Sequence, residues 1–132
     1  MSVRTLEPLR GLKLRWLDIA YASVTDLSPL AGMPLEYLDM GYVKATRDLK
    51  PLAKLPLRQI YLYGTGQPDL SPLAECRNLE GVTLPRGCAG MEGLRRLPKL
   101  RALSYKAATE RSTTGWLSAE EFWKAYDAEK QQ

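Results

Sequence analysis

Residues 26–40 read DLSPLAGMPLEYLDM, and this stretch decides the fold because the chain repeats it. The pattern returns at residues 48–62 as DLKPLAKLPLRQIYL and at residues 69–84 as DLSPLAECRNLEGVTL. Fainter copies begin at Leu6 and Met91. The first apolar residue of each copy falls at positions 6, 27, 49, 70 and 91, so the period is 21 or 22 residues throughout.

Each copy has an extended half and a turn half. In the extended half, the spacing Leu-x-x-Leu-x-Leu places the last two apolar residues on one side of a strand. In the turn half, Ser28 and Ser71 would cap a short helical or 3-10 turn, with Pro29 and Pro72 at the first helical position. One unit cannot bury its leucines alone, whereas stacked copies can.

We therefore predict an α/β fold of the leucine-rich-repeat solenoid type, with about five repeats of 21–22 residues. The parallel β-sheet would lie on the concave face and the short helical turns on the convex face. The predicted organisation is repeats at residues 1–108, a polar loop at residues 109–117 and a C-terminal capping helix at residues 118–130.

The tail carries the start signals of that helix. Ser118 and Glu121 form the capping box Ser-x-x-Glu, and Leu117 with Phe122 fits a hydrophobic staple. An apolar stripe follows at helical spacing: Ala119, Phe122, Trp123 and Tyr126. We expect the stripe to cover the last repeat, and a helix that docks into a partner's groove is the alternative.

The first repeat begins without a polar unit before it. Leu6, Leu9, Leu17 and Ile19 would then form an open edge beside an unpaired strand. Two accounts fit this expectation. The chain is the C-terminal part of a longer repeat array, or the open edge meets another molecule, which allows self-association.

The composition excludes several classes of protein. Apolar residues make up 45% of the chain, and no apolar run approaches the ~20 residues of a membrane span. Residues 1–11 lack the apolar segment of a signal peptide, so we predict a cytoplasmic location and no membrane partner. Two cysteines, Cys76 and Cys88, argue against a disulfide scaffold. Cys76 occupies the repeat position of Met33 and Leu55, which indicates a buried core thiol.

The residues between the leucines of the extended halves are the candidates for binding, because they point away from the core and pave the concave face. In the first three repeats they include these aromatic and acidic residues: Trp16, Asp18, Tyr37, Asp39, Tyr61 and Tyr63. Exposed Trp and Tyr dominate protein interfaces, so we predict a protein or peptide partner at this surface. The alternative is that these aromatic residues only stack across strands.

The sequence offers little for catalysis. It contains no histidine, which excludes histidine-based triads and histidine metal sites. The segment 64–66 lacks the lysine and the spacing of a phosphate-binding loop. Asp18 and Asp39 lie on adjacent predicted strands, where a carboxylate pair suits acid–base chemistry, but nothing else in the sequence supports that role. We predict no enzymatic activity, no metal and no cofactor.

Other charged residues have a structural interpretation. Asp26, Asp48 and Asp69 recur at one repeat position, which indicates hydrogen bonds within a turn. The net charge is +4, and three basic residues gather on the outer turn of the fifth repeat: Arg95, Arg96 and Lys99. No nucleic-acid-binding motif accompanies them, so we interpret them as a solvated face and expect no nucleic-acid partner.

Two parts of the sequence resemble known bacterial proteins. The units that begin at Asp26 and Asp69 resemble short bacterial leucine-rich repeats of the internalin type. The tail SAEEFWKAYD at residues 118–127 is similar to the end of repeat arrays that trail serine/threonine protein kinases of planctomycete-type bacteria. The resemblance covers residues 6–130.

The resemblance implies a repeat region without the catalytic region, because the glycine-rich loop and the catalytic motifs of a kinase are missing from this sequence. We expect a non-enzymatic protein–protein interaction module that binds through its concave face. The alternative is a detached C-terminal regulatory or substrate-recruiting region of a bacterial serine/threonine kinase-like protein.

Overall fold

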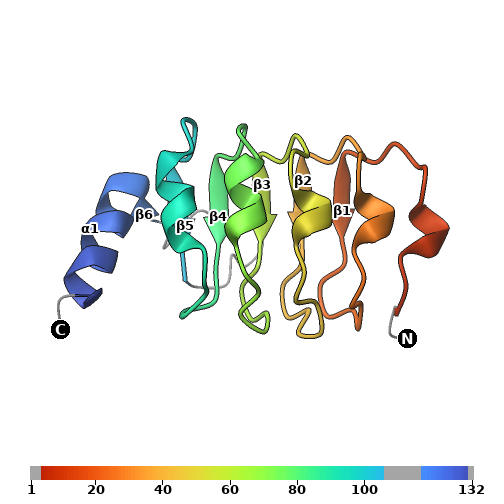
Figure 1. Ribbon diagram of the computed structural model, residues 1–132, viewed down its shortest axis with the longest axis horizontal. Coiled ribbons are helices and arrows are strands. Elements are labelled where there is room, and N and C mark those ends of the chain that lie inside the picture. The colour runs from red at the N-terminus through yellow and green to blue at the C-terminus, as the bar shows by residue number, and fades with distance from the viewer. Residues whose placement is uncertain (1–3, 106–116, 131–132) are drawn as a thin grey trace.

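The structure is a computed structural model that describes residues 4–105 and 117–130. It is an α/β repeat-like fold with one mostly parallel sheet, short 3-10 helices and a C-terminal helix, α1 (Ala119–Lys130) (Figure 1). The strands, in sheet order, are β1 (Trp16–Asp18), β2 (Tyr37–Asp39), β3 (Gln59–Tyr61), β4 (Gly81–Thr83), β5 (Ala102–Ser104) and β6 (Leu117–Ser118). The 3-10 helices are η1 (Glu7–Leu9), η2 (Ser28–Leu30), η3 (Lys50–Leu52), η4 (Ser71–Glu75) and η5 (Met91–Arg96).

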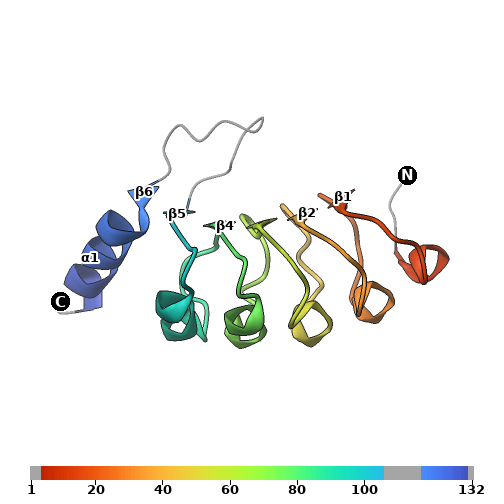
Figure 2. The same cartoon turned by 90° about the horizontal axis from the view of Figure 1, so that it is seen from above.

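The stack of repeats is curved, with the strands on its concave side and the 3-10 helices on its convex side (Figure 2). Strands β1 to β5 are parallel, and each pairs with the next at the same repeat position. Trp16 lies opposite Tyr37, Tyr37 opposite Gln59, and Gln59 opposite Gly81. Because the period is nearly constant, equivalent residues of successive repeats form straight rows across the sheet.

The leucine positions fill the space between the sheet and the 3-10 helices. Leu38, Ile60 and Val82 are fully buried, and they belong to one continuous hydrophobic cluster that runs through all repeats. Removing one such side chain from water contributes about 2 kcal/mol to stability. The core is therefore a column of stacked apolar rows, as the sequence period predicts.

The turn half is capped by an aspartate and not by the predicted serine. Ser28 and Ser71 are the first residues of their 3-10 helices, and neither helix has a capping hydrogen bond from a serine side chain. Instead, Asp26 Oδ1 accepts the Ser28 backbone N–H at 2.8 Å, and Asp69 accepts that of Ser71 at 2.9 Å. Asp48 does the same for Lys50 at 2.9 Å. The predicted role of these three aspartates in turn hydrogen bonds is confirmed, and the proline takes the second helical position.

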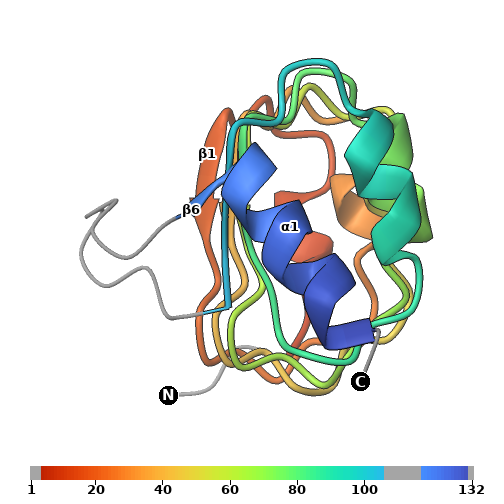
Figure 3. The same cartoon turned by 90° about the vertical axis from the view of Figure 1, so that its left-hand side faces the viewer.

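The C-terminal end of the stack is covered by α1, which lies across the space between the sheet and the 3-10 helices (Figure 3). The capping box is confirmed, because the Glu121 backbone N–H donates to Ser118 Oγ at 3.2 Å. Phe122 is buried in the core, with its ring 5.0 Å from that of Tyr105. Leu117 and Ser118 form β6, an antiparallel strand beside β5 that the sequence did not suggest. The rest of the predicted loop lies outside the described residues.

One of the basic residues of the fifth repeat ties α1 to η5. Arg95 pairs with Asp127 of α1 and with Glu92 at 2.8 Å, and its guanidinium lies 4.6 Å from the centre of the Trp123 ring. Part of the predicted solvated basic face is therefore a contact between two elements. Arg96 and Lys99 are exposed.

The N-terminal end is open, although less so than predicted. Leu6 and Ile19 belong to the buried core, so the expectation that they form part of an open edge is wrong. Leu9 and Leu17 are half-buried. Leu12 is the exposed one at 47%, whereas Leu55, at the same repeat position, is 4% exposed. The difference arises because Leu55 lies between two neighbouring repeats. Among the described residues, Leu12 has a neighbouring repeat only on its C-terminal side.

Both cysteines are free and buried, and Cys76 is fully enclosed in the core as the repeat pattern predicts. Burial raises the pKa of each thiol to about 11, so both stay protonated at neutral pH. Within residues 4–105 and 117–130, every helix is too short or too polar to cross a lipid bilayer.

Candidate functional site

Five of the six predicted binding residues form two adjacent rows on the concave face of the sheet. One row holds Trp16 and Tyr37, and the other holds Asp18, Asp39 and Tyr61. The rows follow from strand geometry, because residues on either side of the central leucine point to the face opposite the core. The parallel register then brings equivalent residues next to each other.

The aromatic residues of these rows contact one another. The Trp16 and Tyr37 rings are stacked, with centroids 5.3 Å apart and planes 13° from parallel. The Tyr61 ring meets Tyr37 edge-on at 5.2 Å. Such pairs contribute about 0.5–1.5 kcal/mol beyond their burial. The stacking that the sequence left as an alternative to binding is therefore present, and the two roles coexist because Trp16 remains 49% exposed.

Tyr61 does not belong to the exposed surface, contrary to the prediction. Its side chain is 8% exposed. Its ring is covered on one side by Tyr37, and its hydroxyl donates a hydrogen bond to Gln59 Oε1 at 3.1 Å. Burial strongly raises the pKa of Tyr37, and hydrogen bonding with Tyr61 raises it further. Tyr37 is therefore a neutral phenol at any physiological pH.

The carboxylates of Asp18 and Asp39 lie on neighbouring strands in register. Each accepts a backbone N–H two residues ahead, from Ala20 and Gly41 respectively, both at 2.9 Å. Burial raises the pKa of Asp39, the Gly41 N–H opposes that rise, and the charge on Asp18 adds to it. Among the described residues, no basic side chain pairs with either carboxylate. The pair thus presents negative charge beside the Trp16–Tyr37 stack.

Tyr63 lies in a different row, at the corner that follows the strands. Its ring meets Tyr42 edge-on at 5.6 Å, and Tyr42 stacks on Tyr21 with centroids 4.8 Å apart. Tyr21 is 72% exposed and Tyr42 is 37% exposed. Neither Tyr21 nor Tyr42 was among the binding residues predicted from the sequence. The available signal was the recurrence of a tyrosine two residues after Ile19 and Met40, where the strand pattern has already ended.

A ladder of alternating charge precedes the strands. It occupies one position in all five repeats: Arg15, Glu36, Arg58, Glu80 and Arg101. Arg58 contacts Glu80 at 2.7 Å and Glu36 at 3.9 Å, while Arg101 contacts Glu80 at 3.0 Å. The sequence carries this signal plainly, since the sign alternates at the repeat period. The ladder neutralises itself across the sheet, in contrast to the two aspartates on the concave face.

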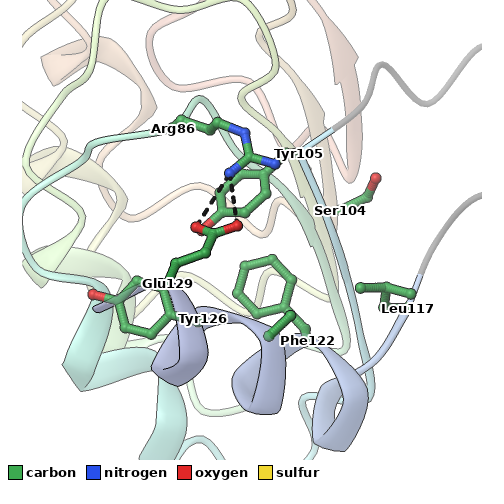
Figure 4. A pocket seen from close by; sticks show the side chains of 8 residues that line it. Arg86, Ser104, Tyr105, Leu117, Phe122, Tyr126 and Glu129 are labelled. Carbon is green, nitrogen blue, oxygen red and sulfur yellow. Dashed lines mark hydrogen bonds and ion pairs between the residues drawn. The ribbon is translucent and has the colours of Figure 1, made fainter. Parts of the chain in front are cut away.

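A pocket lies between α1 and the last full strand, where Tyr105, Phe122 and Tyr126 supply aromatic walls (Figure 4). At its rim, the Arg86 guanidinium lies 4.2 Å from the centre of the Tyr105 ring and 3.1 Å from Glu129 Oε1. This contact joins the fourth repeat to α1. Burial raises the pKa of Tyr105, so its phenol is also neutral. The pocket is mostly apolar and offers no reactive group among its lining residues.

In the part of the chain that the structure describes, no three His, Cys, Asp or Glu side chains gather as metal ligands. The chain was compared with models of protein families and with curated proteins, and neither comparison gave a significant match.

Proposed function

We propose that the chain is a leucine-rich-repeat solenoid that acts as a non-enzymatic protein–protein interaction module and binds through its concave face. The observation that carries the proposal is the stack of the exposed Trp16 on the half-buried Tyr37, beside two carboxylates, Asp18 and Asp39, that form no ion pair with any described residue. Trp and Tyr in rigid surroundings are the residues that most often supply binding energy at protein interfaces. Here the sheet holds both rings in place before a partner arrives.

The charge of the surface indicates the partner's chemistry. Asp18 and Asp39 favour a basic side chain, and the face of the exposed Trp16 ring also attracts a guanidinium or an ammonium group. A peptide segment that carries Arg or Lys beside an apolar residue fits both features. Because the two carboxylates are fixed by the Ala20 and Gly41 N–H groups, little side-chain freedom would be lost on binding.

The test is selection of peptides from a random displayed library on the immobilised chain, followed by measurement of Kd for the enriched peptides. The double variant Trp16→Ala with Tyr37→Ala should weaken binding by about a hundredfold, since each ring is expected to be a hot spot. Tyr21→Gly removes an aromatic side chain that is more exposed and lies off the concave face, so it should leave Kd unchanged. Enriched peptides that bind the double variant as tightly as the unaltered chain would refute the proposal.

A second candidate is a detached regulatory or substrate-recruiting region of a bacterial serine/threonine kinase-like protein. The apolar N-terminal end favours it, because the exposed Leu12 and half-buried Leu9 offer a surface that another part of such a protein would cover. A second copy of this chain could cover the same surface instead. Light scattering over a range of concentrations distinguishes the two alternatives. A dimer that Leu12→Lys converts to a monomer supports self-association, and a monomer at all concentrations excludes self-association.

A further inference from the structure

A second surface lies at the corner that follows the strands, and the concave-face proposal does not use it. A groove there is lined by Tyr42, Lys44, Tyr63, Gly64, Pro85, Arg86 and Tyr105. We call it the corner groove. It crosses the second to fifth repeats, whereas the Trp16–Tyr37 stack lies on the first and second. Its lining is mostly apolar and aromatic, with two basic side chains and no carboxylate among the described residues.

The backbone is strained to place a tyrosine in this groove. Tyr42 has a φ of 61°, a left-handed conformation that bulky residues rarely adopt. In the third repeat the equivalent residue is Gly64, with a φ of 76°, which adopts this conformation without strain. The fold therefore needs no tyrosine at this position. The same left-handed backbone occurs at Tyr21, Lys54 and Gln67, so the conformation belongs to the turns of the repeats, and Tyr42 differs from these residues because its ring lines the groove.

The glycine of the next repeat makes room for that tyrosine ring. A Cβ atom on Gly64 would lie 2.6 Å from Cδ1 of Tyr42, which is closer than any side chain allows. Tyr42 and Gly64 are thus complementary, and the ring lies along the wall of the groove beside Tyr63. A strained tyrosine and an obligatory glycine together keep an aromatic surface in one fixed position.

The charges of the groove select its ligand. Lys44 is exposed, and no described residue forms an ion pair with it. Arg86 is already engaged by Glu129 at 3.1 Å and by the Tyr105 ring at 4.2 Å. The groove therefore offers tyrosine rings, phenol hydroxyl groups and one available ammonium group. That set favours an apolar ligand that has hydrogen-bond acceptors and a single acidic group at one end.

We propose that the corner groove binds a proline-rich peptide segment in the polyproline II conformation, with an acidic residue near Lys44. Proline rings pack against tyrosine rings, and polyproline II backbones have free carbonyl groups that tyrosine hydroxyl groups satisfy. The segment is already extended, so little conformational entropy is lost on binding. A single-stranded nucleic acid fits less well. Its backbone needs several cations, whereas Arg86 is paired with Glu129 and Lys44 is the one other basic residue among the lining residues.

Fluorescence anisotropy with a labelled decaproline peptide that ends in two glutamates tests the proposal. We expect saturable binding that Tyr42→Gly weakens by about tenfold or more, because the variant removes the ring while relieving the strain. Lys54→Gly is the matched control, since it relieves the same strain (φ 67°) outside the groove lining and should leave Kd within about twofold. The variant Trp16→Ala with Tyr37→Ala should also retain binding, which separates this groove from the concave face.

A second experiment changes the charge of Lys44, and its result does not depend on whether Tyr42→Gly folds. Lys44→Glu should reverse the preference, so that a decaproline peptide ending in two lysines binds more tightly than the one ending in two glutamates. The proposal is overturned if neither peptide binds the unaltered chain, or if Lys44→Glu leaves the charge preference unchanged. It is equally overturned if an oligothymidylate probe binds more tightly than the acidic peptide and loses its affinity in Tyr42→Gly.

Discussion

The two ends of the stack carry the same repeat in different surroundings. At the C-terminal end, Leu94 is fully buried and Leu97 is 7% exposed beneath α1. At the N-terminal end, the equivalent residues are Leu9, which is half-buried, and Leu12, which is 47% exposed. The residue type is leucine in all four cases. Burial in this molecule is therefore set by the next element in the stack, as expected for a quasi-one-dimensional array.

The two ends of the concave face also differ, in the size of their side chains. The first two strands present Trp16 and Tyr37, whereas the equivalent residues of β4 and β5 are Gly81 and Ala102. On the concave face, large aromatic side chains thus gather on β1 and β2, and small residues occupy β4 and β5. The helix α1 lies at the end of the stack beyond β5 (Figures 1 and 3). The proposed binding surface therefore lies at the end where the described residues provide no counterpart of α1. The following predictions test this asymmetry in order of expected effect.

Weakening the packing of α1 should have the largest effect on the free energy of unfolding. Phe122→Ala deletes the buried ring by which α1 packs on Tyr105, so we expect the free energy of unfolding to fall by about 3–5 kcal/mol in urea denaturation. Lys124→Ala on the exposed side of the same helix is the control, with a change within about 0.5 kcal/mol. Equal effects of the two variants would show that α1 does not stabilise the last repeat.

A matched pair of leucines compares the ends directly. Leu55→Ala should cost about 2–5 kcal/mol, because the side chain is 4% exposed and leaves a cavity between two repeats. Leu12→Ala, at the same repeat position, should cost well under half of that, since water already reaches its side chain. Thermal unfolding of the two variants measures the difference. Similar destabilisation would mean that the N-terminal end is covered in solution.

The aspartate turns give a pH dependence. Hydrogen bonds from Ser28 and Ser71 lower the pKa of Asp26 and Asp69 below the ordinary carboxyl value of about 4. A lowered pKa in the folded state means that the stabilisation is complete above about pH 4 and is lost as the pH falls through the lowered value. We expect the urea midpoint to decline across this acid range.

Asp69→Asn should flatten that decline, because the asparagine side chain has no proton to gain. Asp26→Asn, in a turn nearer the open end, is the comparison. Each variant is measured by urea unfolding at several pH values from about 3 to 6, the range in which carboxyl groups titrate. A midpoint that falls as steeply in both variants as in the unaltered chain would contradict the role assigned to these turns.

The charge ladder should show the smallest effect. Arg58 lies between two acidic residues, Glu36 and Glu80, whereas Arg15 at the open end pairs with Glu36 alone among the described residues. Arg58→Gln should therefore lower the urea midpoint more than Arg15→Gln does. Because exposed ion pairs are screened by salt, the difference should nearly vanish at about 1 M salt. A difference that persists at high salt would indicate packing by the arginine side chains and not charge.

Much of the fold was predictable from the period alone. A constant spacing of 21 or 22 residues predicts the parallel strands β1 to β5, their register and the rows that they form. The positions of Trp16, Tyr37, Asp18 and Asp39 on the concave face follow from the same pattern. The helix signals at Ser118 and Glu121 are equally local, and the structure contains the capping box that they indicate.

The features that were not predicted depend on contacts between repeats. Tyr61 is buried because Tyr37 and Gln59 enclose it, which a strand pattern cannot show. Strand β6 pairs with β5, which lies well before it in the sequence. The Tyr42 ring fits beside the third repeat because Gly64 has no side chain at the matching position. Local sequence thus predicts the repeat, and packing between repeats determines which residues reach the surface.

The most direct test of the central claim is an NMR map of the surface that binds a library-selected peptide. Amide shifts of the isotope-labelled chain would be recorded as the peptide is added. We predict that the largest changes fall on residues 16–18 and 37–39, at the open end of the concave face. Changes concentrated on α1 or on the convex 3-10 helices would contradict the assignment of the Trp16–Tyr37 surface as the binding site.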